Sequence, residues 1–537
     1  MSTTVIIGGV AGGMSTAARL RRRDENMTII VFEASGNVSF ANCGLPYYVG
    51  GVIPERSSLL LQTPESLKAR FNLDVRVNHR VIAIDTANHT VTVEHNGETF
   101  TQHYDHLVLS PGARPIIPDI PGIERALTLR TVEDVDMIVD TLDNTVKSAA
   151  IIGGGFIGLE LAENFRHRGL EVTLIERAPH ILAPLDEEMA GIVTKHMRDN
   201  GVNILTNANT TSIEDNTLTL NTGEVVPADI VIAAIGVTPE NTLAREAGIE
   251  LGARGGIKVD DQLRTSAPDV FALGDAAEKR DAISGADTLI PLAQTANRHG
   301  RLVADIITGR DVHRLSTQGT AIVGVFGLAA ATVGWNERRA RAEGKDVRIV
   351  HVHPADHAGY YPGATQVHLK LVIDAATDAI LGAQAVGENG VDKRIDVIAT
   401  AMRAGLTASD LTDLELAYSP QYGSAKDPVN IAGMVADNRI NSEQSVQWHE
   451  IPAAIAAGTQ LIDVRTPSEY AAGTIDGARN IPVDELREHL DEISNDAIVF
   501  CQVGLRGHVA STLLQGHGIT VKNLDGGYLS YYHSTLI

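Results

Sequence analysis

The stretch Gly153-Gly154-Gly155-Phe156-Ile157-Gly158 decides the fold of this chain. It follows an apolar run at 150–152 and opens a segment that predicts a helix through residue 168, before a second β-type run at 171–176. The spaced glycines Gly153, Gly155 and Gly158 permit a tight turn and a close approach of a pyrophosphate to the helix N-terminus. Glu176 ends the second run, where a carboxylate accepts a hydrogen bond from a ribose hydroxyl. The stretch therefore predicts a βαβ unit with a dinucleotide site.

The same plan occurs at the N-terminus, with an apolar run at 4–7, a glycine turn at 8–13 and a second apolar run at 28–33. Val10 stands where the middle glycine belongs, whereas Gly8 and Gly13 keep the outer positions and Glu33 supplies the carboxylate. A glycine-rich turn without a ligand is the alternative interpretation. The repeated unit, roughly 30 residues long, predicts parallel α/β sheets and two dinucleotides. Because Glu176 disfavours a 2′-phosphate, we expect NADH rather than NADPH at the second site.

Composition narrows the class of protein. The chain has 537 residues, of which 44% are hydrophobic and 21% charged, and a prior of roughly 150 residues per domain suggests three or four domains. Its formal net charge of -23 argues against nucleic acid or an anionic membrane as a partner. No run approaches the ~20 apolar residues that a membrane helix needs, and the N-terminus lacks the features of a signal peptide, so we expect a cytoplasmic protein. The two cysteines, Cys43 and Cys501, exclude a disulfide framework and a cysteine-rich metal site, and we expect no metal.

Three further elements resemble segments of flavoproteins that bind two dinucleotides. The stretch 265–275 resembles the segment whose final aspartate, here Asp275, contacts the ribityl chain of FAD, and the stretches 109–113 and 234–239 resemble the matching crossover turns. The resemblance implies FAD as a cofactor beside the nicotinamide nucleotide. The cofactor-binding residues that follow are Gly8, Gly12, Gly13, Glu33, Ala113, Asp275, Gly153, Gly155, Gly158, Glu176 and Gly236.

Cys43 lies in Ser39-Phe40-Ala41-Asn42-Cys43-Gly44-Leu45-Pro46-Tyr47, soon after the first βαβ unit. No second cysteine lies nearby, since the other one is Cys501. A lone cysteine must cycle through a mixed disulfide, a persulfide or a sulfenate with a partner from outside the domain. If a helix starts here, its first amides favour the thiolate. A buried, inert cysteine is the alternative.

The stretch 39–51, together with the glycine turns, resembles the coenzyme A-disulfide reductase branch of the single-cysteine flavoprotein reductases, which is related to NADH peroxidase and NADH oxidase. The resemblance covers residues 1 to about 440 and implies a homodimer, with coenzyme A as a substrate or bound ligand. It implies that Ser15, Arg19 and Arg22 hold coenzyme A phosphates, for which a plain solvated cationic face is the alternative. The other residues that it implicates are Ser39 and Asn42 beside the reacting sulfur, His299, Tyr418 and Lys426 around flavin or substrate, and the partner subunit's Tyr361 near Cys43.

The C-terminal part reads as an independent α/β module after a polar linker at 436–447. The loop Cys501-Gln502-Val503-Gly504-Leu505-Arg506 follows an apolar strand and precedes a predicted helix, so its amides and Arg506 form an anion cradle that stabilises a thiolate or persulfide. With the stretches 463–470, 477–482 and 524–527, this loop resembles the rhodanese (sulfurtransferase) family, although Thr474 replaces the usual histidine of a Gly-His-Ile segment. A degenerate rhodanese fold used for docking is the alternative.

The predicted fold is therefore α/β, with two Rossmann-like dinucleotide-binding domains, an α+β dimerisation domain and a C-terminal α/β rhodanese domain. The predicted boundaries are 1–148 and 250–320 for FAD, 149–249 for NAD(P)H, 321–440 for dimerisation and 446–537 for rhodanese. The expected activity is NADH-dependent reduction of small thiol-derived substrates, namely persulfide, polysulfide or coenzyme A disulfide. The expected catalytic residues are Cys43, Cys501, Arg506, Tyr361 and Tyr418. Two alternatives stay open: an NADH peroxidase or oxidase that cycles a Cys43 sulfenate, and a sulfur-trafficking or sensing protein.

Overall fold

The computed structural model describes residues 2–314, 316–441 and 444–537. Its backbone divides into two compact units. The first comprises the residues up to Arg177 together with Gly201–Gly319, and the second comprises Ala178–Asn200 together with Thr320–Ile537.

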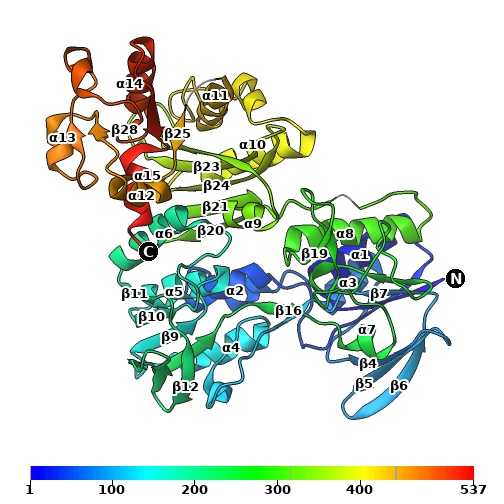
Figure 1. Cartoon of the computed structure of the whole chain (residues 1–537). Coiled ribbons are helices and arrows are strands. Elements are labelled where there is room, and N and C mark those ends of the chain that lie inside the picture. Colours follow the sequence, from blue (N-terminus) through cyan, green and yellow to red (C-terminus); the bar gives the residue numbers. More distant parts are fainter. Residues whose placement is uncertain (1, 315, 442–443) are drawn as a thin grey trace. The chain divides into compact units, whose positions relative to one another are not determined.

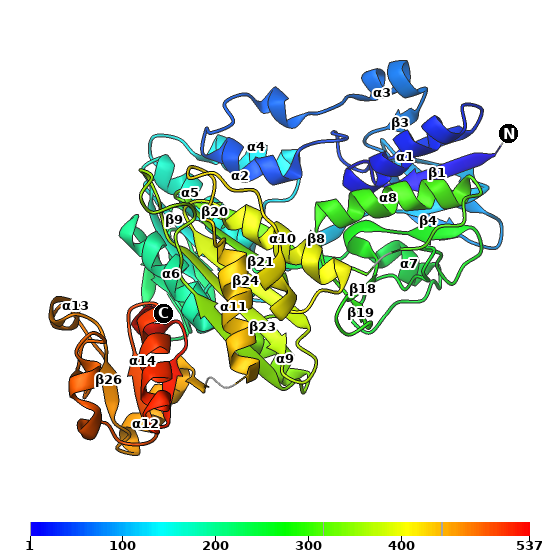
Figure 2. The ribbon, with the colours of Figure 1, turned by 90° about the horizontal axis from the view of Figure 1, so that it is seen from above.

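The first unit contains a parallel sheet in the order β17-β7-β1-β2-β3. Its strands are β1 (Thr3–Ile7), β2 (Thr28–Phe32), β3 (Asp74–Arg76), β7 (His106–Leu109) and β17 (Val270–Ala272). The helices α1 (Ala11–Arg23) and α8 (Ala293–Ile307) lie side by side, as the blue and green helices of Figure 2 show. Because the strands are parallel, their carboxyl ends meet at one edge of the sheet, where a ligand of such a fold binds.

A second parallel sheet in the same unit has the order β11-β10-β9-β15. Its strands are β9 (Ser148–Ile152), β10 (Glu171–Ile175), β11 (Val202–Leu205) and β15 (Ile230–Ala233), and helix α5 (Phe156–His167) packs on β9 and β10. The predicted strand–turn–helix–strand repeat is thus confirmed in both places. Short antiparallel strands β8 (Ala113–Pro115) and β16 (Val237–Pro239) pair with each other at the two crossover turns.

The second unit is built on an antiparallel sheet in the order β20-β21-β24-β23-β22. Its strands are β20 (Ala321–Val325), β21 (Leu328–Gly334), β22 (Val347–Val352), β23 (Val367–Asp374) and β24 (Ile380–Gly387). Helices α10 (Val391–Ala404) and α11 (Pro428–Asn441) pack on this sheet, as Figure 2 shows in yellow and gold, and α6 (Glu187–Asp199) contacts β21 and β24.

The linker predicted at 436–447 is corrected by the structure. Helix α11 runs on to Asn441, and β25 (Ser445–Val446) begins the next sheet; positions 442–443 lie outside the described residues. Ala436 is fully buried, and the polar Arg439 hydrogen-bonds to Ile349 and Asp525. The polar composition of this segment therefore reflects specific tertiary contacts rather than a solvated linker.

The C-terminal sheet is parallel and has the order β25-β29-β28-β26-β27. The remaining strands are β26 (Leu461–Asp463), β27 (Arg479–Asn480), β28 (Ala497–Phe500) and β29 (Val521–Leu524). The helices are α12 (Ile451–Ala456), α13 (Pro467–Ala471), α14 (Leu505–Gly516) and α15 (Gly527–Ser534), and α15, drawn in red in Figure 1, contacts α6. Cys501 follows the central strand β28, so its loop lies at the carboxyl edge of the sheet.

One buried cation holds three carboxylates together in the second unit. Lys370 on β23 is fully buried, and its Nζ lies 2.6 Å from Glu188, 2.8 Å from Glu337 and 2.9 Å from Asp186. Burial opposes the charge of Lys370, but the three carboxylates outweigh it and raise the pKa of Lys370, so the charge persists.

We expect Lys370→Met to lower the free energy of unfolding by about 3–5 kcal/mol, because it leaves buried carboxylates without a counter-charge. Urea unfolding followed by circular dichroism measures the loss. The control is Lys195→Met, which breaks an exposed pair with Asp199 on α6 and should cost less than about 1 kcal/mol. Equal losses in the two variants would contradict this account of the core.

Candidate active site

Two glycine turns share one hydrogen-bonding pattern. In the first, the Gly9 amide donates to Glu33 Oε2 at 2.7 Å, and in the second the Gly154 amide donates to Glu176 Oε2 at 2.7 Å. Each turn thus fixes the carboxylate expected to contact a ribose. Both turns also begin with a glycine in the left-handed region, Gly8 at φ 101° and Gly153 at φ 111°.

The packing behind the turns explains the outer glycines. A Cβ on Gly13 would lie 1.9 Å from the Gly8 carbonyl oxygen, and a Cβ on Gly158 would lie 2.1 Å from that of Gly153. At Gly155 an added Cβ would meet nothing within 4 Å, so the middle of the second turn faces open space. This open face at the start of α5 fits a pyrophosphate.

The residues expected to hold FAD gather at the carboxyl edge of the first sheet. Asp275 lies on a short 3-10 turn (Gly274–Ala276) directly after β17, and Ala113 begins β8 after β7. Gly12 packs so closely that a Cβ there would lie 2.2 Å from Leu273 Cδ1. Burial lowers the pKa of Arg130, while Asp275 and Glu33 are among the carboxylates that raise it, which places this cation among the predicted cofactor residues. The glycine turn, the ribose carboxylate and Asp275 together fit FAD. Gly236, at φ 116°, lies just after β15 in the other crossover turn.

The segment that carries Cys43 is tied to the first glycine turn. The Ser39 amide donates to the Gly9 carbonyl at 2.8 Å, and Ser39 itself has φ 51°. Cys43 follows on a 3-10 turn (Asn42–Gly44) that leads into the five-residue helix α2 (Leu45–Val49), and both Asn42 and Cys43 are exposed. The structure therefore brings Ser39 and the redox cysteine segment to the predicted FAD turn.

A backbone hydrogen bond favours the Cys43 thiolate, as expected where a helix starts, but other effects outweigh it. Partial desolvation of the accessible Cys43 side chain, followed by the charges of Glu160 and Asp275, raises the pKa of its thiol. Tyr47, one helical turn after Cys43, donates to Glu160 Oε1 at 3.1 Å. Burial raises the pKa of Glu160 on α5 to about 7, so its charge changes near neutral pH.

Glu160 and Tyr47 were not predicted from the sequence. The available signal was the position of Glu160 in the first turns of α5, the helix that follows Gly155. Which residue it faces depends on the packing of α2 against α5.

We expect Glu160→Gln to speed the alkylation of Cys43 about threefold or more above neutral pH, because a carboxylate that disfavours the thiolate is removed. The gain should vanish below the pKa of about 7 of Glu160, where the wild-type side chain is already neutral. Iodoacetamide labelling of the holoenzyme, quantified on the Cys43 peptide by mass spectrometry, measures it.

The exposed Glu171, at the start of β10, gives a matched control, Glu171→Gln, that should react like the wild type. Unchanged or slower labelling of the Glu160 variant would show that the carboxylate does not act on Cys43.

The predicted coenzyme A phosphate contacts differ in their surroundings. Arg19 Nη2 pairs with Asp305 at 2.8 Å and Ser15 donates to Asn297 at 2.6 Å, whereas Arg22 is exposed. Much of the charge on this face of α1 is thus already compensated within the first unit.

His299 on α8 is buried. Burial, with Lys279 and Arg314, lowers its pKa to about 3, and its Nδ1 has no hydrogen-bond partner within the part of the chain that the structure describes. A neutral imidazole with an unsatisfied nitrogen suits a residue that contacts a bound molecule.

The predicted tyrosines of the second unit lie on two neighbouring loops. The Tyr360 and Tyr418 hydroxyls are 3.1 Å apart, and the Ala358 amide donates to Gly423, joining the loops. Tyr361 packs edge-on against His357 and remains 43% exposed. Lys426 is also exposed. Exposed tyrosines on an otherwise ordered pair of loops are typical of a surface that contributes to a neighbouring subunit.

Cys501 is buried at the end of β28. The Gly504 amide, whose residue has φ 97°, donates to Cys501 Sγ at 3.2 Å, as expected of a loop that stabilises sulfur anions. Arg506 makes a bidentate pair with Glu469, at 2.6 and 2.8 Å, and this pair lowers the pKa of Glu469 to about 2. The arginine is therefore oriented by Glu469, which lies in the stretch 463–470 but was given no role from the sequence.

A second arginine supports the same loop. Arg465 pairs with Asp463, donates to Gln502 Oε1 at 2.8 Å and lies over the Tyr528 ring at 4.4 Å. Thr474, which replaces the expected histidine, donates to the same Asp463 at 2.8 Å. The threonine at this position thus supplies a hydrogen bond to the buried aspartate.

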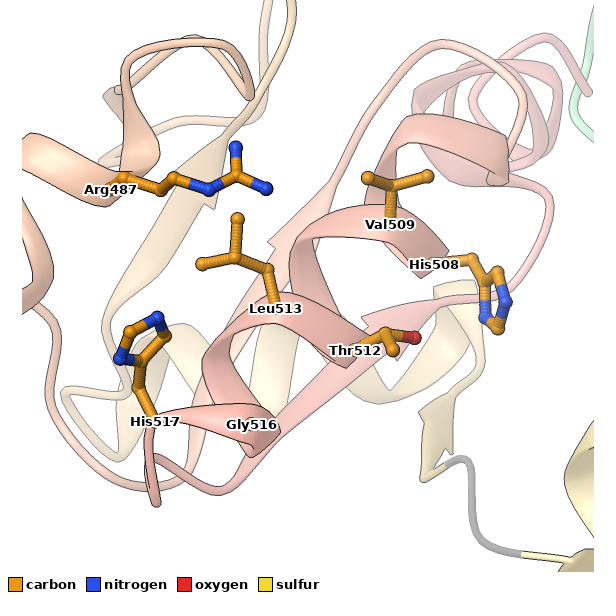
Figure 3. Close-up of a pocket in the computed structure, with 7 residues that line it drawn as sticks. All are labelled: Arg487, His508, Val509, Thr512, Leu513, Gly516 and His517. Atoms are coloured by element: carbon orange, nitrogen blue, oxygen red, sulfur yellow. The ribbon is translucent and has the colours of Figure 1, made fainter.

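A hollow of about 470 Å³ lies on the outer face of α14. Figure 3 shows Arg487 reaching over Leu513, with His508, Val509 and Thr512 along the helix and His517 at its end. Neither Cys501 nor Arg506 lines this hollow.

Comparison with known proteins identifies the domains. Residues 2–300 match the pyridine nucleotide-disulphide oxidoreductase family, residues 320–427 its dimerisation domain and residues 448–534 the rhodanese-like domain. The coenzyme A disulfide reductase of Staphylococcus haemolyticus is 36% identical over 440 residues, which is 81% of this chain and 99% of that protein.

Two solved structures cover nearly the whole chain. Reduced CoADR-RHD from Bacillus anthracis has a TM-score of 0.98 at 48% identity, covering 99% of this chain and 98% of its own. An NAD-dependent persulfide reductase from A. fulgidus has a TM-score of 0.94 at 37% identity, covering 98% and 100%.

This chain belongs to the pyridine nucleotide-disulphide oxidoreductase family. It is an FAD- and pyridine nucleotide-dependent type of enzyme that also carries a dimerisation domain and a rhodanese domain. Among the described residues, no helix combines the length and apolarity required to span a bilayer.

Proposed function

We propose that this protein is an NADH-dependent reductase of persulfides, including coenzyme A persulfide, and of polysulfides and coenzyme A disulfide. The observation that carries the proposal is the Ser39–Gly9 hydrogen bond, which ties a segment with a single cysteine to the first dinucleotide turn. A dinucleotide cofactor bound through this turn would therefore lie in the same site as the Cys43 thiol. The names of the similar proteins, a coenzyme A disulfide reductase and a persulfide reductase, support this substrate class.

The proposed reaction passes through one sulfur. The Cys43 thiolate attacks the outer sulfur of a persulfide R-S-SH, which breaks the S–S bond, releases R-SH and leaves a Cys43 persulfide. FAD, when bound, would supply the two electrons of NADH at this site. Two-electron reduction of the Cys43 persulfide breaks its S–S bond, regenerates the Cys43 thiolate and releases sulfide. The sum is R-S-SH + NADH + H⁺ → R-SH + H₂S + NAD⁺.

Other side chains take supporting roles in the proposal. Ser39 and Asn42 position the substrate sulfur, while Ser15, Arg19 and Arg22 meet the phosphates of a coenzyme A substrate. His299, Tyr418 and Lys426 complete the surroundings of flavin or substrate. The chain acts as a homodimer in the cytoplasm, and the partner subunit's Tyr361 approaches Cys43. Glu176, held by the Gly154 amide, favours NADH over NADPH because a 2′-phosphate would meet its charge.

The presence of a rhodanese domain favours a sulfane-sulfur compound over a plain disulfide as the substrate of the whole protein. Cys501, with the Gly504 amide on its sulfur, takes sulfane sulfur from a donor and passes it to a small thiol, and Cys43 then reduces the resulting persulfide. A peroxidase that cycles a Cys43 sulfenate would give this domain no role.

A substrate panel tests the proposal. With persulfide or polysulfide and NADH under anaerobic conditions, we expect about one sulfide per NADH consumed, and slower NADH consumption with peroxide. Faster NADH consumption with peroxide than with persulfide or polysulfide would overturn the proposed substrate class.

Substitution of each cysteine tests which of the two activities its thiol carries. Cys43→Ser should retain FAD yet lose NADH-dependent sulfide release by about a hundredfold or more. Cys501→Ser should lose thiosulfate:cyanide sulfur transfer while it keeps at least part of the reductase activity on small substrates. Loss of both activities in the Cys501 variant would contradict separate roles, and the measurements are NADH absorbance and thiocyanate formation.

A further inference from the structure

The Gly526-Gly527 turn of the rhodanese domain packs between the sheet of the dimerisation domain and the Cys501 loop. Both glycines are in the left-handed region, at φ 64° and 66°. A Cβ on Gly526 would lie 2.7 Å from His351 Cβ and 2.9 Å from His353 Nε2, both on or next to β22. A Cβ on Gly527 would lie 2.4 Å from the Cys501 carbonyl oxygen. Two consecutive residues thus contact the sheet of the dimerisation domain and the back of the Cys501 loop.

The turn holds the Cys501 loop directly. The Tyr528 amide donates to the Cys501 carbonyl at 2.7 Å, and the Leu529 amide donates to the Gln502 carbonyl at 3.0 Å. These bonds set the position of the backbone that carries the sulfur. A displacement of the turn would therefore move Cys501 relative to the Gly504 amide and Arg506.

Asp525, just before the turn, is anchored from outside the rhodanese domain. Its carboxylate is fully buried and accepts from His351 Nδ1 at 2.7 Å, from the His351 amide at 3.1 Å and from Arg439. Gln447 Nε2, within the rhodanese domain itself, adds a hydrogen bond at 3.1 Å. Two cations of the dimerisation-domain side, on β22 and α11, thus hold one carboxylate of the rhodanese.

His351 also joins Asp525 to the buried charged cluster around Lys370. His351 Nε2 lies 2.9 Å from Glu188 Oε1, which also pairs with Lys370. The carboxylates of Asp525 and Glu188 raise the pKa of His351 to about 9 against the opposing effect of burial. His351 is therefore charged at neutral pH and bridges two carboxylates.

We propose that His351 and Arg439, outside the rhodanese domain, are positioning residues for sulfur transfer at Cys501, acting through Asp525 and the Gly526-Gly527 turn. The inference rests on the proposed sulfur-transfer role of Cys501 and extends it. It assigns to the dimerisation domain a part in rhodanese chemistry beyond subunit contact.

The test compares two substitutions at one position. His351→Ala removes the donor to Asp525, and we expect kcat for thiosulfate:cyanide transfer to fall about tenfold or more, with KM for thiosulfate within about twofold. His351→Asn places an amide nitrogen close to the position of Nδ1 and should restore most of kcat. NADH-dependent reduction of coenzyme A disulfide should stay within about twofold in both variants.

Two further variants keep the test decisive. Gln447→Ala removes a neutral donor to Asp525, together with the side-chain cap of the 3-10 turn Trp448–Glu450, and should lower kcat a few-fold. Lys345→Ala breaks a partly exposed pair with Asp374 in the same domain and should leave kcat unchanged.

Wild-type kcat in both His351→Ala and Gln447→Ala would overturn the proposal, and so would an equal loss in His351→Ala and His351→Asn. Absence of sulfur transfer in the wild type would instead refute the proposed role of Cys501.

Discussion

The hydrogen bond from the Ser39 amide to the Gly9 carbonyl is the contact on which the redox site depends. It ties the Cys43 segment to a turn whose own amide holds Glu33. That turn lies at the carboxyl edge of a parallel sheet, where Asp275 also lies. A cysteine placed there without a partner thiol nearby has to exchange sulfur with a molecule from outside the domain.

Sequence patterns predicted the parts of the fold that depend on interactions between residues close together in the chain. Gly13 and Gly158 follow from backbone crowding within one turn, and Gly8 and Gly153 follow from the positive φ at the start of each turn. The apolar runs before and after these turns became buried strands. The Cys501 loop was predictable for the same reason, because its amides and its sulfur are neighbours in sequence.

The failed and missing predictions concern contacts between distant segments. Partial desolvation, followed by the charges of Glu160 and Asp275, raises the pKa of the Cys43 thiol and outweighs the local backbone hydrogen bond that lowers it. The polar residues after 436 suggested a linker, yet Arg439 pairs with Asp525. Arg506 is oriented by Glu469, which lies on α13. Such partners follow only from tertiary packing.

In the proposed reaction, electrons leave the protein through the single sulfur of Cys43. Mass spectrometry of the Cys43 peptide, after the holoenzyme is mixed with a persulfide in the absence of NADH, detects this sulfur as the acceptor. We expect one added sulfur atom or one substrate thiol on Cys43, and its complete loss when NADH is added. An unmodified Cys43 under conditions of full turnover, or an adduct that survives NADH, would contradict it.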